Sequence, residues 1–187
     1  MAVIDLDPAW KEAVEDVFPY TPLQLCCTHF ERIVDRTIPK RKRTPRQHEL
    51  KEMVRDVLYA STEEESRRAF DELMSRKGYF RDKKSRYVIN SLKENYGLLT
   101  THFRVLDSPR SNNIAESIID KIEMRQKMIR GYKRARTARN SLKLIVTHYR
   151  FKPFASCKKK EHNGKSPLNL AGVDTSKMNW IVYSQTD

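Results

Sequence analysis

The first forty residues combine two short apolar runs with two amphipathic helical patterns. Residues 2–4 and 23–26 predict strands, and helical patterns follow them over residues 8–17 and 28–36. Asp7, directly before a proline, is typical of a helix N-cap. The first helix has apolar residues at helical spacing, which predicts one buried face: Trp10, Ala13, Val14 and Val17. This β-α-β-α order predicts a parallel or mixed sheet with helices packed against it.

The pattern becomes helical throughout after a basic connector that lies between two prolines, over residues 38–46. One apolar stripe follows, and then Thr62-x-x-Glu65 predicts a capping box that opens a helix ending before Gly78. A third helix is predicted over residues 82–95. The apolar positions expected inside these three helices are Leu50, Met53, Val54, Val57, Leu58, Ala69, Phe70, Leu73, Met74, Val88 and Leu92. We interpret residues 40–105 as an all-helical insertion between two pieces of an α/β domain.

The last long helical pattern starts near Asn113 and runs to about Tyr149, with a break expected at Gly131. Beyond it, residues 153–187 are polar and basic, and we expect this tail to be poorly ordered. The predicted fold is therefore mainly α with a few short strands.

The charge of the chain says more about its partners than its length does. The chain has 187 residues, 37 Lys and Arg against 24 Asp and Glu, and a net charge of +13, which favours a polyanionic partner such as nucleic acid. No apolar run is long enough for a membrane span and no signal-peptide pattern begins the chain, so we expect a cytoplasmic, nucleoid-associated protein that does not bind membranes. The three cysteines, two adjacent (Cys26 and Cys27) and one distant (Cys157), do not form a disulfide framework and indicate free thiols. The sequence contains no glycine-rich phosphate-binding loop, which argues against ATP or NAD chemistry.

Two acidic residues lie in settings that suit metal binding. Asp5 follows the first predicted strand, and open α/β sheets commonly place ligands at the carboxyl ends of strands. Glu116 lies just inside the predicted start of the last long helix. Each residue also has an ordinary interpretation, since Asp5 suits a turn and Glu116 is favoured by the helix dipole. The local sequence alone leaves both interpretations open.

Several blocks of the chain resemble the Mutator-type transposases of insertion sequences. The order and spacing of these blocks are more specific than any one of them, and together they cover nearly the whole chain. They are residues 5–19 (DLDPAWKEAVEDVFP), 24–32 (QLCCTHFER), 112–117 (NNIAES), 130–132 (RGY), 149–151 (YRF) and 163–172 (NGKSPLNLAG).

The resemblance implies an RNase H-like catalytic domain with a triad of two aspartates and one glutamate (DDE), interrupted by a helical insertion. It implies that Asp5 is the second acid and Glu116 the third, with Asp7 as the runner-up for Asp5. It also implies Mg²⁺ (or Mn²⁺) as the cofactor of the complete enzyme, and transposon ends and target DNA as partners. The expected segments are residues 1–39 (core with the second acid), 40–105 (insertion), 106–152 (core helix with the third acid) and 153–187 (tail).

Cys26 and His29 match a Cys-x-x-His motif that such transposases carry near the site. A structural zinc site needs four ligands, and only the distant Cys157 and His162 remain, so we expect Cys26 and His29 to pack or hydrogen-bond near the strand end. Asp120 and Glu123 follow Glu116 on the same helix, and we interpret both as part of a solvated face.

Clusters of basic residues suit contact with DNA phosphates, because Lys and Arg neutralise the backbone and release counterions. The stretch from residue 130 to residue 143 contains no acid and is the strongest of them. The residues expected to bind DNA are Arg41, Lys42, Arg43, Arg130, Lys133, Arg134, Arg136 and Arg139.

The sequence departs from the family pattern in one respect, because we find no counterpart of the first catalytic aspartate. We therefore expect a truncated transposase fragment that is inactive alone, and that works as a homo-oligomer or with a complementing N-terminal half. Exposed strand edges and a partly uncovered stripe on the first helix predict marginal stability. The alternative is a non-catalytic, basic DNA-binding module that modulates transposition. A helical protein-interaction domain unrelated to DNA is disfavoured by the charge.

Overall fold

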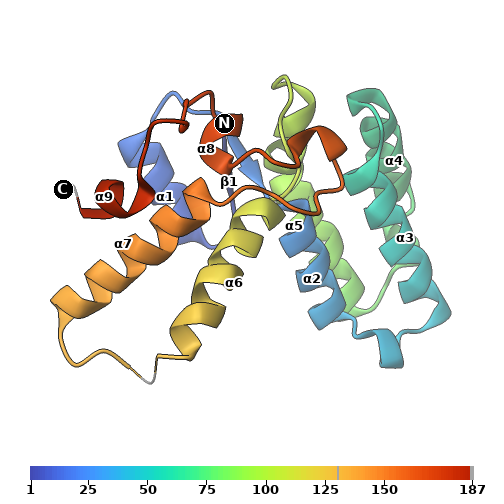
Figure 1. Cartoon of the computed structure of the whole chain (residues 1–187). Helices are drawn as coiled ribbons and strands as arrows, with labels where there is room; N and C mark the ends of the chain where they lie inside the picture. Colours follow the sequence, from blue (N-terminus) through green and yellow to red (C-terminus); the bar gives the residue numbers. More distant parts are fainter. Residues whose placement is uncertain (130, 186–187) are drawn as a thin grey trace. The chain divides into compact units, whose positions relative to one another are not determined.

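The protein is described by a computed structural model over residues 1–129 and 131–185, and consists mainly of helices (Figure 1). Two compact units divide the chain, Met1–Ile114 and Ala115–Asp187. The expected mainly α fold with a few short strands is confirmed. The boundaries between the four predicted segments do not coincide with the boundary between the units, so the division into core and insertion stays a prediction.

The first unit begins with a small parallel sheet. Strand β1 (Ala2–Ile4) pairs with β2 (Leu23–Leu25), with Ala2 opposite Leu23 and Ile4 opposite Leu25. Helix α1 (Pro8–Val17) connects the strands, and helix α2 (Cys27–Thr37) follows β2. The predicted β-α-β-α order is therefore confirmed, and both strands end at the same edge of the sheet.

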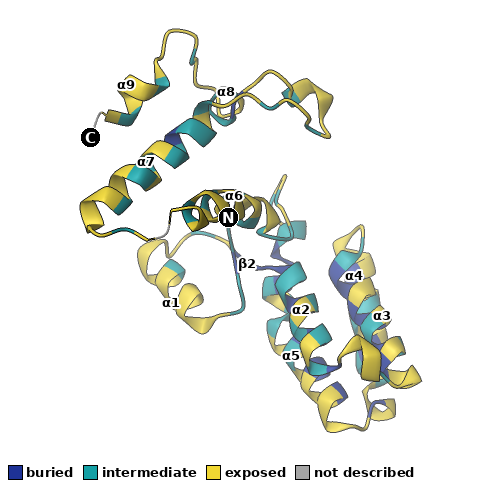
Figure 2. Ribbon diagram, turned by 60° about the horizontal axis from the view of Figure 1, so that its bottom comes forward, coloured by how far each residue is buried: buried dark blue, intermediate teal, exposed yellow. Residues whose placement is uncertain are grey.

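Three long helices follow in the first unit. A 3₁₀ turn, η1 (Lys40–Lys42), leads into α3 (Pro45–Tyr59), α4 (Glu63–Ser75) and α5 (Lys83–Leu99), with 3₁₀ turns η2 (Lys77–Tyr79) and η3 (Thr101–Phe103) after α4 and α5. Figure 2 shows their buried faces turned toward one another. The apolar core joins them to the sheet and α2 through Leu23, Leu25, Phe30, Val34, Leu50, Val54, Val57, Leu58, Leu73, Val88, Leu92 and Leu99.

Two local predictions need correction. The apolar face of α1 is not buried, since Trp10 is 59% and Val17 66% exposed, and only Val14 packs against the core. This agrees with the expectation that the stripe is partly uncovered. The capping box at α4 is only half formed, because Thr62 Oγ1 accepts a hydrogen bond from Glu65 N (3.1 Å) while Glu65 Oε2 accepts one from Ser61 N (3.0 Å).

The second unit contains most of helix α6 (Asn113–Lys127), then α7 (Ala135–Phe151), η4 (Lys160–His162), α8 (Pro167–Leu170) and α9 (Trp180–Gln185). The break expected at Gly131 is confirmed, because this glycine has a φ of 105° between the two long helices. The tail is more regular than expected, since α8 and α9 both pack on α7 and a capping box at Ser166 opens α8. None of the described helices has the length and apolar character needed to cross a membrane.

Candidate active site

Asp5 is held at the carboxyl end of β1 by two nitrogen groups. Its Oδ1 atom lies 2.9 Å from His29 Nδ1 and accepts a hydrogen bond of 2.7 Å from Asn112 Nδ2. Within the described residues, no hydrogen bond reaches the other carboxylate oxygen, Oδ2. The Asp5 side chain is 42% exposed, so its carboxylate can be reached from solvent.

His29 is oriented from its far side by an arginine on the same helix. Its Nε2 atom lies 3.1 Å from Arg32 Nη1, one turn further along α2. A guanidinium group only donates hydrogen bonds, so Nε2 of His29 must be the acceptor and the neutral ring carries its proton on Nδ1. Nδ1 is the ring nitrogen that lies 2.9 Å from Asp5 Oδ1. The chain Arg32–His29–Asp5 therefore fixes one carboxylate oxygen of Asp5 and leaves the other available.

Asn112 reaches Asp5 because the chain that enters α6 is tied to the start of α2. Cys27 N donates a hydrogen bond of 3.0 Å to Arg110 O, two residues before Asn112. Asn112 Oδ1 is buried and has no hydrogen-bond partner among the described residues. The side chain therefore gives its amide group to Asp5 and keeps a carbonyl oxygen, a good ligand atom for a hard cation, without a donor.

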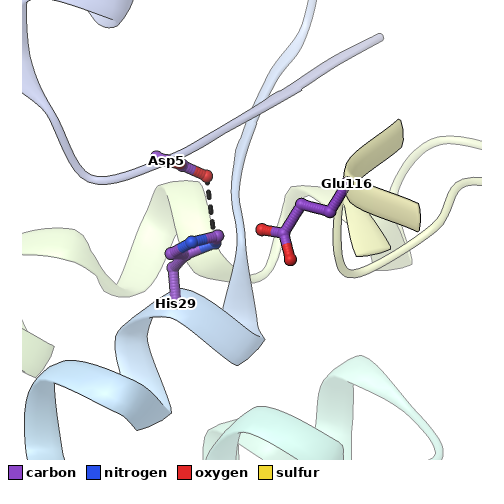
Figure 3. A group of neighbouring side chains, drawn as sticks. All are labelled: Asp5, His29 and Glu116. Carbon is purple, nitrogen blue, oxygen red and sulfur yellow. Dashed lines mark ion pairs between the residues drawn. The ribbon is translucent and has the colours of Figure 1, made fainter. Parts of the chain in front are cut away.

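Glu116 lies in the first turn of α6 and is half-buried. Figure 3 draws this residue with Asp5 and His29, and the dashed line marks the pair between Asp5 and His29. Glu116 belongs to the second unit, while Asp5, His29 and Asn112 belong to the first. The local geometry of the first unit thus assembles Asp5, His29 and Asn112, and the role of Glu116 stays a prediction.

The alternative carboxylates have other roles. Asp7 caps α1, where its Oδ1 accepts a hydrogen bond of 3.0 Å from Ala9 N, as its place before proline predicted. Glu123 lies 3.9 Å from Lys127, one turn further along α6, and both Asp120 and Glu123 are exposed. The solvated-face interpretation of these two residues is therefore confirmed.

The cysteines beside the site are buried thiols. Cys26 is fully buried, and its N–H donates to Ile4 O (2.8 Å), so this residue joins β1 to the start of α2. Burial, with a contribution from neighbouring Cys26, raises the pKa of the Cys27 thiol to about 12. Among the described residues, no cluster of metal-binding side chains includes a cysteine. Cys26 and His29 therefore help to build the strand end, as expected, with His29 in direct contact with Asp5.

The basic residues predicted to bind DNA fall into different settings. Arg43 is buried, with a side chain only 4% exposed, and its guanidinium pairs with Asp35 and donates to Ile38 O, so it cannot be a surface cation. Arg130 lies outside the described residues. The other six are exposed, in η1 and around the start of α7: Arg41, Lys42, Lys133, Arg134, Arg136 and Arg139.

Comparison with protein families matches residues 1–152 to the family described as "Transposase, Mutator family". The chain belongs to the Mutator family of transposases. The match covers β1, the Asp5–His29 pair, all three long helices after η1, and both α6 and α7. Transposition acts on DNA, so membership of the Mutator family makes DNA the partner in general terms. Neither the curated proteins nor the solved structures gave a match.

Two features of the site were missed in the sequence. Asn112 stood inside a block that resembled the family, but no contact with Asp5 was predicted for it. Arg32 was also unassigned, although its spacing of three residues from His29 on a helix was a usable signal. The pair between Asn112 and Asp5 joins residues 107 positions apart, and only the tertiary structure brings them together.

Proposed function

We propose that this chain carries part of an RNase H-like, DDE-type catalytic domain, with Asp5 as the second acid and Glu116 as the third. The observation that carries the proposal is the Asp5 carboxylate at the end of β1, with Oδ1 held by His29 and Asn112 and Oδ2 without a hydrogen bond from the described residues. Membership of the Mutator family and the parallel β1–β2 pair both support this assignment. A carboxylate fixed in this way is suited to bind a cation through one oxygen.

The residues of the site fit a divalent cation such as Mg²⁺ or Mn²⁺. These cations prefer oxygen ligands, and the Oδ2 of Asp5 and the unpartnered Oδ1 of Asn112 are both of that kind. Glu116 lies in the first turn of α6, four residues after Asn112 in the sequence, and the resemblance to the Mutator family gives it the third place in the triad. This assignment makes Glu116 the proposed second carboxylate ligand.

The side chains around the cation would have separate roles. Asp5, Glu116 and the carbonyl of Asn112 would hold it, and His29 would keep the Asp5 carboxylate in one rotamer. A bound Mg²⁺ supplies charge that stabilises a phosphodiester under attack and activates the attacking oxygen. The exposed cations near the start of α7 would hold the DNA backbone through its phosphates.

We propose further that strand cleavage needs a third carboxylate in addition to Asp5 and Glu116. The resemblance gives these residues the second and third places in the triad, and two carboxylates alone hold two metal ions poorly. With only Asp5 and Glu116 as carboxylate ligands, the site would support DNA binding without strand cleavage.

The second candidate function is a non-catalytic DNA-binding module that modulates transposition. The acid-free stretch over residues 130–143 favours it, because four exposed cations there would serve DNA binding without any metal: Lys133, Arg134, Arg136 and Arg139. The two candidates differ in one property, since only the first requires Glu116 and a divalent cation.

The test is a titration of labelled duplex DNA at low and high salt, with and without Mg²⁺, followed by analysis of the DNA for nicks. We expect salt-sensitive binding without nicking, and binding that Mg²⁺ strengthens. Glu116→Gln should abolish the effect of Mg²⁺. The matched control is Glu123→Gln, the same substitution two turns along the same helix, which should retain the effect.

Each result separates the candidates. Salt-sensitive binding that ignores Mg²⁺ in all three proteins would support the non-catalytic module and overturn the metal site. Nicking that depends on Mg²⁺ and on Glu116 would support the metal site and show that the chain needs no further carboxylate. An absence of binding even at low salt would overturn both candidates.

A further inference from the structure

The three long helices of the first unit form a bundle with acidic residues at one end and basic residues at the other. Helix α4 begins with three glutamates, Glu63, Glu64 and Glu65. Its other end leads through η2 to the start of α5, where basic residues collect. Helix α3 starts at this same end, since Gln47 Nε2 donates a hydrogen bond of 3.1 Å to Asp82, the N-cap of α5. Helices of 13 to 17 residues place these two ends about 20 Å apart.

The basic end forms a surface that we call the distal basic surface. Its side chains come from three places: the start of α3, the segment formed by η2 and residues 80–81, and the start of α5. All of its cations are exposed, and none of them forms an ion pair with a described carboxylate: Arg46, Lys77, Arg81, Lys83, Lys84 and Arg86.

The acidic groups near the distal basic surface are already engaged. Asp82 accepts hydrogen bonds from Gln47 and from both the N–H and the hydroxyl of Ser85. Burial alone would raise the pKa of Asp82, but the bonds from Ser85 outweigh it and lower that pKa. Glu49 is paired with Arg76. Asp82 therefore stays ionised but is a single negative charge among six exposed cations, so the distal basic surface keeps a net positive charge.

The surface is also held in shape. The guanidinium of Arg46 lies 4.7 Å from the centre of the Tyr79 ring, and Arg76 lies 5.7 Å from the same ring. Tyr79 packs edge-on against Phe80, which is fully buried in the core. Because these contacts fix η2 against α3, the cations keep their spacing at a low entropic cost when a rigid polyanion binds.

At the opposite end of the three helices, the cations have carboxylate neighbours. There, Arg104 pairs with Glu63 at 2.9 Å, and the three glutamates of the first turn of α4 lie close to Arg67 and Arg68 in the sequence. The cations at that end are therefore balanced by nearby acids. This asymmetry distinguishes the distal basic surface from the general excess of Lys and Arg.

We infer that the distal basic surface binds the phosphate backbone of duplex DNA, and that it extends the predicted contact in η1, which directly precedes α3. The inference rests on the proposed function, because DNA as the ligand comes from the transposase assignment. Lys and Arg side chains on a rigid frame bind phosphates without reading sequence, and each contact releases a counterion. The surface would hold DNA flanking the bond that reacts and would not take part in chemistry.

The test compares two triple variants of the full chain that lose the same charge. Lys83→Gln/Lys84→Gln/Arg86→Gln removes three cations from the distal basic surface. Arg67→Gln/Arg68→Gln/Lys93→Gln removes three exposed cations from elsewhere on α4 and α5. Affinity for a labelled DNA duplex of arbitrary sequence is measured between about 50 and 200 mM salt, the range in which phosphate contacts dominate.

We expect the first variant to bind at least about tenfold more weakly at low salt. The plot of log K against log salt has a negative slope, and its steepness should decrease by about 2 to 3 in this variant. The second variant should change the slope by less than about 1. Circular dichroism and the urea midpoint verify folding, and Lys77→Gln/Arg81→Gln tests the same surface from η2 if the triple variant does not fold.

The outcomes distinguish this inference from the proposed function. Wild-type binding that both triple variants weaken equally would overturn the inference, because the effect would then reflect total charge. Wild-type binding that the first variant leaves unchanged would also overturn it while the proposed function stands. Failure of the wild-type chain to bind DNA at low salt would overturn the proposed function itself.

Discussion

Gln24, the polar residue of strand β2, should contribute strongly to the stability of the first unit. It lies in the middle of β2 and is fully buried. Its Nε2 donates to Leu99 O (2.9 Å), and its Oε1 accepts from His102 N (2.8 Å). These two bonds hold the end of α5 and the start of η3 against the sheet, on the path that leads to Asn112.

The substitution Gln24→Leu tests this role because it keeps the approximate volume and removes both bonds, together with the bond of 2.6 Å from Nε2 to Leu25 O. It leaves Leu99 O and His102 N buried with fewer partners, and an unsatisfied buried group costs about 1 to 3 kcal/mol. The thiol of Cys27 also approaches Leu99 O at 3.5 Å, so that carbonyl keeps a weak partner. We expect the free energy of unfolding to fall by about 2 to 4 kcal/mol, a large part of a typical total of about 5 to 15.

Urea unfolding followed by circular dichroism measures this difference, and hydrogen exchange of the His102 amide reports the bond directly. Gln126→Leu is the control, since the described structure gives Gln126 no side-chain hydrogen bond and we expect a change below about 0.5 kcal/mol. A loss below about 1 kcal/mol for Gln24→Leu, with the His102 amide still protected, would refute the reasoning.

Two further predictions concern titration and thiol chemistry. Burial alone would raise the pKa of Asp35, but hydrogen bonds from Lys51 and Arg43 outweigh it and lower that pKa. Ionised Asp35 therefore stabilises the folded chain at pH values above its ordinary pKa of about 4. This stabilisation is lost as the pH falls through the lower pKa of the folded state. Asp35→Asn should therefore flatten the acid side of a plot of unfolding free energy against pH, and an unchanged acid slope would contradict the pairing. Cys26 and Cys27 are buried while Cys157 is partly exposed, so a thiol reagent should label one cysteine quickly in the native chain and two only after unfolding; rapid labelling of all three would show that the strand end opens.

The sequence predicted elements whose causes are local. Asp7 caps α1 through a bond to Ala9, and the stripe from Leu50 to Leu58 is buried because its spacing matches one helical face. Such signals need only a few neighbouring positions. The break at Gly131 was predictable for the same reason, since the local backbone needs a positive φ.

Other features depend on residues far apart in the chain. The burial of Gln24 depends on Leu99 and His102, more than seventy positions away, and nothing near Gln24 indicates it. Arg43 looked like one more cation in a basic connector, but Asp35 on the preceding helix pairs with it. The pattern on α1 predicted a buried face that the described residues leave largely exposed. In each case tertiary contacts, or their absence, decided the outcome.

The central claim is that Asp5 and Glu116 bind a divalent cation, and Mn²⁺ binding followed by electron paramagnetic resonance tests it most directly. The assay needs no catalytic activity, so it applies to the chain alone. We expect the wild-type chain and Glu123→Gln to bind Mn²⁺ alike, and Asp5→Asn and Glu116→Gln each to weaken binding at least tenfold. Equal binding by all four proteins, or none by the wild type, would contradict the claim.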